Sequence, residues 1–377
     1  MRDGNSKVNR WLLFPAFLYG VGVRLRNYLY NSGILPSTLY PIPIICVGNL
    51  AVGGTGKSPM VEYLLRLLQN KKYRVAVVSR GYKRESSGLV VATATSSAKE
   101  IGDEPCLMKQ KFSQVTIVVD GNRKRALNYL CSLPQEVRPQ VIVMDDGFQH
   151  RSVRPAYSIL LSVYHRPLWD DKLLPAGRLR EPITSRHRAD MIVITKCPPQ
   201  TSPIAERIAE RKLELYPHQK MLFSQVSYGD LYPLFDVDMA CGDRGSKILK
   251  SSEEGEPYVV ALAGIAHPQD FFNHTKEAYK VQENISYSDH HNYGKKDVFF
   301  WEEKRKKLFF ERNLKVHFIC TEKDAVKLRE LKDFFSPTLK NSFWVQSIES
   351  CFRADGARVL EQEILKCICK TNERVVR

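Results

Sequence analysis

A glycine-rich loop between two apolar segments constrains this chain most strongly. The run Gly53-Gly54-Thr55-Gly56-Lys57-Ser58 follows the apolar residues 42–47 and precedes residues 60–69, whose apolar side chains recur at helical spacing. Glycines let backbone N–H groups approach a phosphate, and a helix start attracts negative charge. The pattern therefore predicts a strand, a phosphate-binding P-loop and a helix; the alternative is a glycine-rich turn that binds nothing.

The individual residues of this loop suit a bound nucleotide. Lys57 is expected to reach the β- and γ-phosphates, and Ser58 to bind Mg²⁺. The full P-loop pattern has glycine where this chain has Ala51, but the rest of the pattern and its context still favour a nucleotide site. We expect the nucleotide to contact Ala51, Val52, Gly53, Gly54, Thr55, Gly56, Lys57 and Ser58.

A second carboxylate is needed at such a metal site, and one apolar run supplies it. Residues 141–144 are entirely apolar and are followed by Asp145 and Asp146. An apolar strand that ends in an acid is the Walker B arrangement, which places a carboxylate beside Mg²⁺. The sequence leaves open which of the two aspartates binds the metal, and a solvated turn is the alternative.

The remaining chain alternates apolar runs with helical stretches. The runs are continuous, as expected for strands that are buried on both faces of a parallel sheet. After about residue 217 a turn-punctuated β segment intervenes, and the α/β pattern then restarts near residue 258. We therefore expect an α/β fold in four parts: an N-terminal membrane-interface helix (1–35), a P-loop domain with a parallel sheet (36–220), a short β linker (221–255) and a smaller C-terminal α/β domain (256–377).

The N-terminal segment is compositionally unusual. Residues 11–23 carry no charge and include four aromatic side chains, and Arg24 and Arg26 follow directly. A spanning helix needs roughly 20 apolar residues, so this run is too short, and it lacks a signal-peptide cleavage pattern. We expect a helix in the membrane interface; a helix buried against the domain core is the alternative.

The charge of the chain indicates an anionic partner without identifying it. Lys and Arg number 57 against 41 Asp and Glu, which gives a formal charge of +16. Nucleotides, phosphorylated substrates, anionic membranes and nucleic acid all fit such a surplus. The basic stretch 302–315 is expected to be an exposed helix face, and no basic groove with interleaved aromatic residues predicts nucleic-acid binding.

Several shorter motifs carry information only when they are taken together. In order along the chain, the motifs resemble those of tetraacyldisaccharide 4'-kinase, the lipid A 4'-kinase family of Gram-negative bacteria. The resemblance extends from about residue 40 to 330. It rests on Val47-Gly48-Asn49-Leu50 before the P-loop, Val78-Ser79-Arg80-Gly81-Tyr82, Gly102-Asp103-Glu104-Pro105, Asp145-Asp146-Gly147-Phe148-Gln149-His150, Leu173-Leu174-Pro175-Ala176-Gly177-Arg178-Leu179-Arg180-Glu181, Ala263-Gly264-Ile265, Asp289-His290 and Thr321-Glu322-Lys323-Asp324-Ala325.

The resemblance implies a lipid kinase that uses ATP and Mg²⁺. Its acceptor would be the 4'-hydroxyl of a tetraacylated glucosamine disaccharide 1-phosphate, its product lipid IVA, and its location the cytoplasmic face of the bacterial inner membrane as a peripheral or monotopic protein. No nucleic acid and no obligate protein partner are implied. The catalytic pair would be Asp103 and His290, with His291 the less favoured partner. Candidate substrate contacts are Arg80, Tyr82, Arg123, Gln149, His150, Arg178, Arg180 and Glu181.

Two other classes of P-loop protein compete with this interpretation. A partitioning-type ATPase often has lysine at the position of Val52, and this chain does not. A metallochaperone-like GTPase would need an aspartate where Thr195-Lys196-Cys197 is followed by Pro198. A nucleic-acid-dependent NTPase is favoured only by the net charge.

Overall fold

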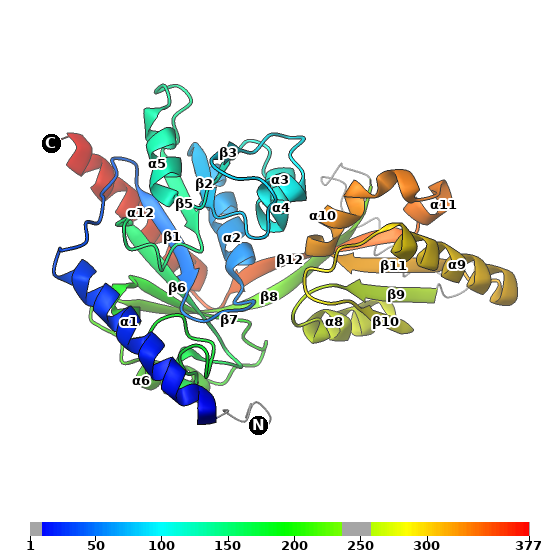
Figure 1. Ribbon diagram of the computed structural model, residues 1–377. Coiled ribbons are helices and arrows are strands. Elements are labelled where there is room, and N and C mark those ends of the chain that lie inside the picture. The colour runs from blue at the N-terminus through cyan, green and yellow to red at the C-terminus, as the bar shows by residue number, and fades with distance from the viewer. Residues whose placement is uncertain (1–9, 236–257, 377) are drawn as a thin grey trace.

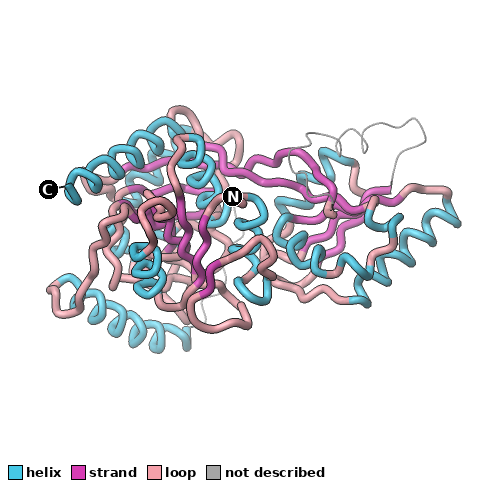
Figure 2. Tube along the Cα trace, turned by 90° about the horizontal axis from the view of Figure 1, so that it is seen from above, coloured by secondary structure: helices cyan, strands magenta, loops and turns pink. Residues whose placement is uncertain are grey.

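The computed structural model describes residues 10–235 and 258–376, and it has two lobes joined by a strand ribbon (Figures 1 and 2). The first lobe is built on strands in the order β3-β4-β2-β5-β1-β6-β7-β8, parallel except for the short edge strand β3. Most of these strands are buried along their whole length, as their continuous apolar runs predict. They comprise β1 (Ile44–Asn49), β2 (Val75–Ser79), β3 (Val90–Val91), β4 (Thr116–Val119), β5 (Val141–Asp145), β6 (Tyr157–Val163), β7 (Met191–Thr195) and β8 (Lys220–Pro233).

Helices cover both faces of this sheet. One core contains Leu64 and Leu68 of the P-loop helix together with Val77 and Val143 of the strands. A second core on the opposite face contains Leu127. The helices of this lobe are α2 (Lys57–Asn70), α3 (Ala98–Ile101), α4 (Asp103–Lys111), α5 (Arg123–Ser132) and α6 (Pro203–Leu213), with 3₁₀ turns η1 (Arg10–Leu12), η2 (Leu168–Asp170) and η3 (Ile183–Arg188).

The second lobe is a smaller α/β layer structure. Its strands follow the order β10-β9-β11-β12, and the three pairings are parallel. The buried Trp301 and Phe318 lie in the core on one face, and Phe271 lies in the core on the other. The elements are β9 (Tyr258–Ala263), α8 (Gln269–Tyr279), β10 (Glu283–Ser286), α9 (Lys295–Arg312), β11 (Val316–Thr321), α10 (Glu322–Glu330), η4 (Lys332–Phe334), α11 (Pro337–Lys340) and β12 (Phe343–Phe352).

Two strands, not one linker, connect the lobes. β8 starts beside β7 at Lys220 and then pairs antiparallel with β12 from Ser224 to Pro233. The expected linker 221–255 thus contributes one strand of the ribbon, and residues 236–255 lie outside the described residues. Its partner strand, β12, lies more than 100 residues later in the chain. Local sequence patterns do not predict that these two strands pair.

The C-terminal helix corrects the expected extent of the second domain. We expected residues 256–377 to form one unit, but α12 (Gly356–Val376) returns to the first lobe (Figure 1). Its stripe Leu360, Ile364 and Ile368 is buried in the same core as the P-loop helix. The apolar spacing predicts an amphipathic helix, but it does not specify which sheet that helix covers.

The N-terminal helix α1 (Leu13–Asn31) leaves an apolar stripe in solvent. Its buried residues are Ala16 and Gly20, and a Cβ at Gly20 would lie 2.8 Å from Leu173. Trp11, just before the helix, is 88% exposed. Across the part of the chain that the structure describes, no helix is both long and apolar enough to cross a membrane. The exposed apolar residues, many of them three or four positions apart, are Trp11, Leu13, Phe14, Phe17, Leu18, Tyr19, Val21, Leu25 and Tyr28.

Candidate active site

A cleft of about 1130 Å³ is lined by residues of both lobes. The P-loop and the carboxyl ends of β2 and β5 line it from the first lobe. Asp289, His290 and Lys323 line it from the second. In a parallel α/β sheet, ligands bind beyond the carboxyl ends of the strands, so the cleft lies where this fold places ligands.

The P-loop is held in an open shape by its glycines and by a buried threonine. Gly53 and Gly56 have φ of 107° and 85°, and no atom lies within 4 Å of a Cβ built at Gly53 or Gly54. The Thr55 hydroxyl accepts a hydrogen bond from Asn49 at 2.6 Å, and its carbonyl accepts one from Thr195 at 2.8 Å. Backbone amides can therefore face a phosphate at close range.

The two acids after β5 have different environments. Asp146 has φ of 50°; its carboxylate lies 3.6 Å from the Lys57 ammonium and 3.1 Å from Arg180. Burial raises the pKa of Asp146, but these cations outweigh burial and hold it below its usual value. Asp145 is buried and accepts a hydrogen bond from Ser79, while its other oxygen has no partner. Burial, with Glu104 and Asp146 nearby, raises the pKa of Asp145 to about 7.

This environment fits a small divalent cation. Mg²⁺ is usually held by one or two carboxylates together with phosphate oxygens and water. The unpartnered oxygen of Asp145 supplies such a ligand, and Ser58 lies in the first turn of α2. In the described ranges 10–235 and 258–376, no group of three or more His, Cys, Asp or Glu side chains is arranged to hold a metal ion.

A buried arginine faces the same acids from the side. Arg123 is 2% exposed; its Nη1 donates to the Asp120 carbonyl, while Nε and Nη2 have no partner. Burial lowers the pKa of Arg123, and the charges of Asp145 and Asp146 oppose that shift. Burial, with Arg123 and Arg80 nearby, also lowers the pKa of His150 to about 4, so His150 is neutral near pH 7. The guanidinium nitrogens without a partner can donate hydrogen bonds to an anion.

Asp103 and His290 meet across the cleft. Nδ1 of His290 lies 3.0 Å from Oδ2 of Asp103. Gly102, with φ of 93°, starts α4 and places Asp103 in its first turn. His290 itself has φ of 61°, a left-handed conformation that is uncommon outside glycine and often found at functional sites.

Two lysines of α10 complete this pair. Nζ of Lys327 lies 3.1 Å from the same Asp103 oxygen, and Nζ of Lys323 lies 3.1 Å from Nε2 of His290. An ammonium group has no lone pair, so Nε2 must accept from Lys323 and Nδ1–H must donate to Asp103. Burial raises the pKa of Asp103, but His290 and Lys327 outweigh burial and hold it below its usual value.

The sequence model of the family described as tetraacyldisaccharide-1-P 4'-kinase matches residues 8–367. A Porphyromonas gingivalis protein named tetraacyldisaccharide 4'-kinase is 44% identical over 367 residues, which cover 96% of this chain and 98% of that protein. This chain belongs to the tetraacyldisaccharide 4'-kinase family.

Other relatives agree with this membership. A Parabacteroides distasonis protein with the same name is 44% identical over 334 residues, 88% of this chain and 87% of that protein. A crystal structure described as the apo form of LpxK from Aquifex aeolicus in complex with ATP has a TM-score of 0.71 and 28% identity, and covers 94% of this chain and 98% of that one. The expected P-loop α/β fold and the resemblance are thereby confirmed, and membership favours a kinase over the ATPase, GTPase and nucleic-acid alternatives.

Most of the predicted substrate contacts line the cleft. Arg80, Tyr82, Gln149 and His150 line the cleft. Arg180 lines it too, between Asp146 and Gln149.

Arg178 and Glu181 make structural contacts of their own. Arg178 is exposed and does not line the cleft, and its carbonyl accepts from the P-loop amide of Val52. Glu181 lines the cleft, but its buried carboxylate accepts hydrogen bonds from Arg188 and from Asn27 of α1, so Glu181 also joins the first lobe to α1.

Residue-by-residue reasoning missed two residues that support the site of this kinase. Lys327 was not anticipated, because the motif that carries Lys323 ends at Ala325. The signal was present as an i, i+4 lysine pair, which places both ammonium groups on one helix face. Ser79, which holds Asp145, was also not distinguished from its neighbours.

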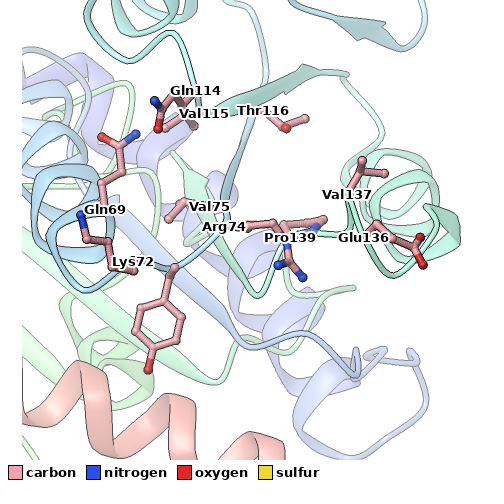
Figure 3. Close-up of a pocket in the computed structure, with 11 residues that line it drawn as sticks. Gln69, Lys72, Arg74, Val75, Gln114, Val115, Thr116, Glu136, Val137 and Pro139 are labelled. Carbon is pink, nitrogen blue, oxygen red and sulfur yellow. The ribbon is translucent and has the colours of Figure 1, made fainter.

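A smaller cavity of about 440 Å³ lies elsewhere on the first lobe (Figure 3). It is lined by Gln69, Lys72, Arg74, Val75 and Thr116, near the amino ends of β2 and β4. Ligands of such sheets bind at the opposite ends of the strands, so we assign no site to it.

Proposed function

We propose that this chain transfers the γ-phosphoryl group of ATP to the 4'-hydroxyl of a tetraacylated glucosamine disaccharide 1-phosphate, forming lipid IVA. The observation that carries this proposal is the family match over residues 8–367. The chemistry of the cleft supports this proposal. The P-loop of the first lobe lines the cleft, and a carboxylate–histidine pair, whose histidine comes from the second lobe, lines it too.

ATP is bound by the P-loop, where Lys57 contacts the β- and γ-phosphates. Ser58 and Asp145 would hold Mg²⁺, because Asp145 has the unpartnered oxygen while Asp146 is engaged by Lys57 and Arg180. When bound, the ion supplies positive charge to the phosphates. Asp146 then keeps Lys57 and Arg180 oriented toward the transferring group.

Asp103 accepts the proton of the acceptor hydroxyl. As the hydroxyl oxygen forms its bond to the γ-phosphorus, the bond from that phosphorus to the β–γ bridging oxygen breaks and ADP leaves. A carboxylate of low pKa suffices, because in a loose transition state the proton is transferred late. His290 donates to Asp103 through Nδ1 and keeps the carboxylate aimed at the acceptor.

Lys323 and Lys327 act through this pair. Lys327 holds Asp103 ionised, and Lys323 fixes the histidine tautomer that donates to it. Both lysines belong to the second lobe, whereas Asp103 belongs to the first. The base is therefore complete only when the lobes are together, which protects ATP from hydrolysis in the open enzyme.

Arginines in the cleft bind the anionic parts of the reactants. Arg123 offers two unpartnered nitrogens and Arg80 lies at the carboxyl end of β2, so together with Arg180 they suit the transferring phosphoryl or the 1-phosphate of the lipid. Tyr82, whose ring lies 5.8 Å from that of His290, is placed to contact the sugar.

The exposed stripe of α1 brings the enzyme to its acceptor in the membrane. Tyr19 donates to the Arg180 carbonyl at 2.7 Å and Arg26 donates to the Gln149 carbonyl at 2.9 Å, so α1 is joined directly to the cleft. A helix with exposed aromatic residues and adjacent arginines binds the interface of an anionic bilayer. We propose that the protein acts at the cytoplasmic face of the inner membrane, as the family resemblance implies, and the exposed stripe of α1 supports a membrane contact.

Acceptor dependence tests the proposal. In detergent micelles, ADP formation should require the disaccharide 1-phosphate lipid and should be absent with the same lipid blocked at its 4'-hydroxyl. ADP formation at equal rates with both lipids, or stimulation by DNA, would overturn the assigned acceptor.

A further inference from the structure

The helix α9 presents aromatic residues on the side that faces away from its own core. Val298 and Trp301 are buried in the second lobe. Phe299, Phe300 and Phe310 are 67%, 50% and 81% exposed. Burying a phenylalanine ordinarily stabilises a protein by about 1.5–3 kcal/mol, so solvent-exposed phenylalanines grouped on one helix indicate a surface that is covered by a partner.

Phe299 and Phe310 lie on one line along the helix. Phe299 and Phe310 are separated by eleven residues, which is close to three helical turns, or roughly 16 Å along the axis. Phe300 and Phe309 lie on either side of that line, and the rings of Phe309 and Phe310 are 5.6 Å apart. We call these four residues, Phe299, Phe300, Phe309 and Phe310, the α9 aromatic stripe.

Lysines surround the stripe. The helix has seven Lys or Arg against four Asp or Glu. The exposed lysines on the same half of the helix are Lys295, Lys296, Lys306 and Lys307. Of the four acids, Glu302 pairs with Arg305 and Glu303 with Lys306, and the helix keeps a surplus of three positive charges. The outward face is therefore aromatic and cationic.

We propose that the α9 aromatic stripe is a second membrane-contacting surface, which binds an anionic lipid bilayer. Protein interfaces are depleted of lysine in their centres, whereas interfacial helices combine buried aromatic residues with lysines that reach lipid phosphates. The charge of the stripe thus complements a bilayer better than it complements a second protein. The inference rests on the proposed function, which supplies the reason for this chain to meet a membrane.

The position of α9 gives the second lobe a membrane contact of its own. α1 belongs to the first lobe and α9 lies at the far side of the second (Figure 1). Each lobe then has its own contact with the bilayer that holds the acceptor. The lobe that carries His290, Lys323 and Lys327 is retained beside the membrane even when the cleft is open.

Vesicle binding of the full chain tests the proposal without substrate. We would compare wild type with Phe299→Ser/Phe310→Ser, using vesicles of phosphatidylglycerol with phosphatidylcholine and vesicles of phosphatidylcholine alone. The double variant should bind the anionic vesicles about tenfold more weakly, because two rings no longer enter the interface. Lys296→Glu/Lys307→Glu should lose the preference for phosphatidylglycerol. Val137→Ser, which removes an exposed apolar residue elsewhere, should bind as wild type does.

Two controls separate this inference from its alternatives. All variants should keep the wild-type melting temperature and the wild-type rate on lipid dispersed in detergent, where no bilayer is present. Unchanged vesicle binding by the phenylalanine variant overturns the inference. If light scattering then shows that this variant has lost a dimer, the stripe is a contact between two copies of the chain instead. If wild type fails to phosphorylate the lipid but the variants still lose vesicle binding, the proposed function fails and the surface stands.

Discussion

Nδ1 of His290 lies 3.0 Å from Oδ2 of Asp103, although 187 residues separate the two in the chain. Asp103 starts α4 in the first lobe, and His290 follows β10 in the second. The Asp103–His290 hydrogen bond, which belongs to the candidate base, therefore depends on how the two lobes are arranged.

Asp103→Ala and His290→Ala should each lower kcat by about 10²–10⁴, the usual contribution of a positioned acid–base group. ATP affinity should change little, because neither side chain contacts the P-loop. Since the residues act as a unit, the double variant should be little slower than either single variant. Steady-state kinetics with nucleotide-binding measurements would check this.

Two outcomes would contradict that account. Strictly additive losses would mean that Asp103 and His290 act independently. Loss of ATP binding in place of kcat would move both residues into the nucleotide site. His291→Ala is the matched control, since His291 lies beside His290 but pairs at 3.5 Å with Asp297 instead.

Lys327→Met should change the pH dependence of the reaction. Lys327 helps to hold the pKa of Asp103 below its usual value, so its removal raises that pKa. Activity requires the ionised carboxylate and is lost as the pH falls through the pKa of Asp103. The acidic limb of kcat/KM should therefore move to higher pH in the variant, while Lys327→Arg should keep a limb near that of wild type. An unmoved limb would show that Lys327 is only structural.

Lys57→Ala should slow phosphoryl transfer by about 10²–10³, because a group that stabilises charge in the transition state is lost. The structural reason is that Lys57 lies in the first turn of α2, directly after the glycine loop, and 3.6 Å from Asp146. Lys99→Ala, on the exposed surface of α3, is the control. Near-normal turnover by the Lys57 variant would contradict a role for the P-loop lysine in phosphoryl transfer.

A buried ion triad joins the elements that carry the site. Nζ of Lys111, on α4, lies 2.6 Å from Glu62 of α2 and 2.7 Å from Glu322 of α10. Lys111→Met would leave buried Glu322 without its ion-pair partner and buried Glu62 with only Arg66, at 3.4 Å, and should destabilise the protein by about 3–5 kcal/mol. Glu62→Gln should cost much less, because Lys111 keeps Glu322. Thermal unfolding of both variants would check the order, and equal losses would contradict it.

The same triad makes stability depend on pH. Burial raises the pKa of Glu62 from 4.5 to about 7, with Lys111 opposing that shift. The folded protein therefore binds more protons than the unfolded chain between these values, and the free energy of unfolding falls as pH rises through that window. Glu62→Gln removes this contribution, so its melting temperature relative to wild type should be higher at about pH 8 than at about pH 5. A difference that is independent of pH would refute the shift.

Replacing Trp11 and Phe14 by serine should weaken binding to anionic vesicles while leaving the fold intact. Both side chains are exposed, and neither takes part in the contacts of Tyr19 and Arg26 with the cleft. Vesicle sedimentation would measure the change. Full sedimentation of this variant would place the main membrane contact elsewhere, with the α9 aromatic stripe as the next candidate.

Elements with strong local signals could be predicted from the sequence. Strand β5 (Val141–Asp145) contains the apolar run 141–144, and β1 (Ile44–Asn49) overlaps the apolar run 42–47. The P-loop was expected from its glycines, because a loop, its strand and its helix are contiguous in the chain. The same locality placed Asp145 and Asp146 at the end of β5.

What was missed depends on contacts between distant segments. The pairing of β12 with β8 and the return of α12 to the first core are set by tertiary packing, not by local pattern. Lys327 acquires its importance from Asp103 of the other lobe. Arg178 was grouped with the acceptor site by motif, yet it does not line the cleft, because the loop folds so that the Arg178 carbonyl accepts a hydrogen bond from Val52.

The identity of the phosphorylated product tests the central claim most directly. The purified chain would be incubated with labelled ATP, Mg²⁺ and the tetraacylated disaccharide 1-phosphate, and the lipid would be analysed by mass spectrometry with fragmentation. The account predicts that the lipid gains one phosphoryl group on the 4' oxygen, and that Asp103→Ala gives little of this product. Label released as inorganic phosphate with the lipid unchanged, or a phosphoryl group on any other oxygen, would contradict it.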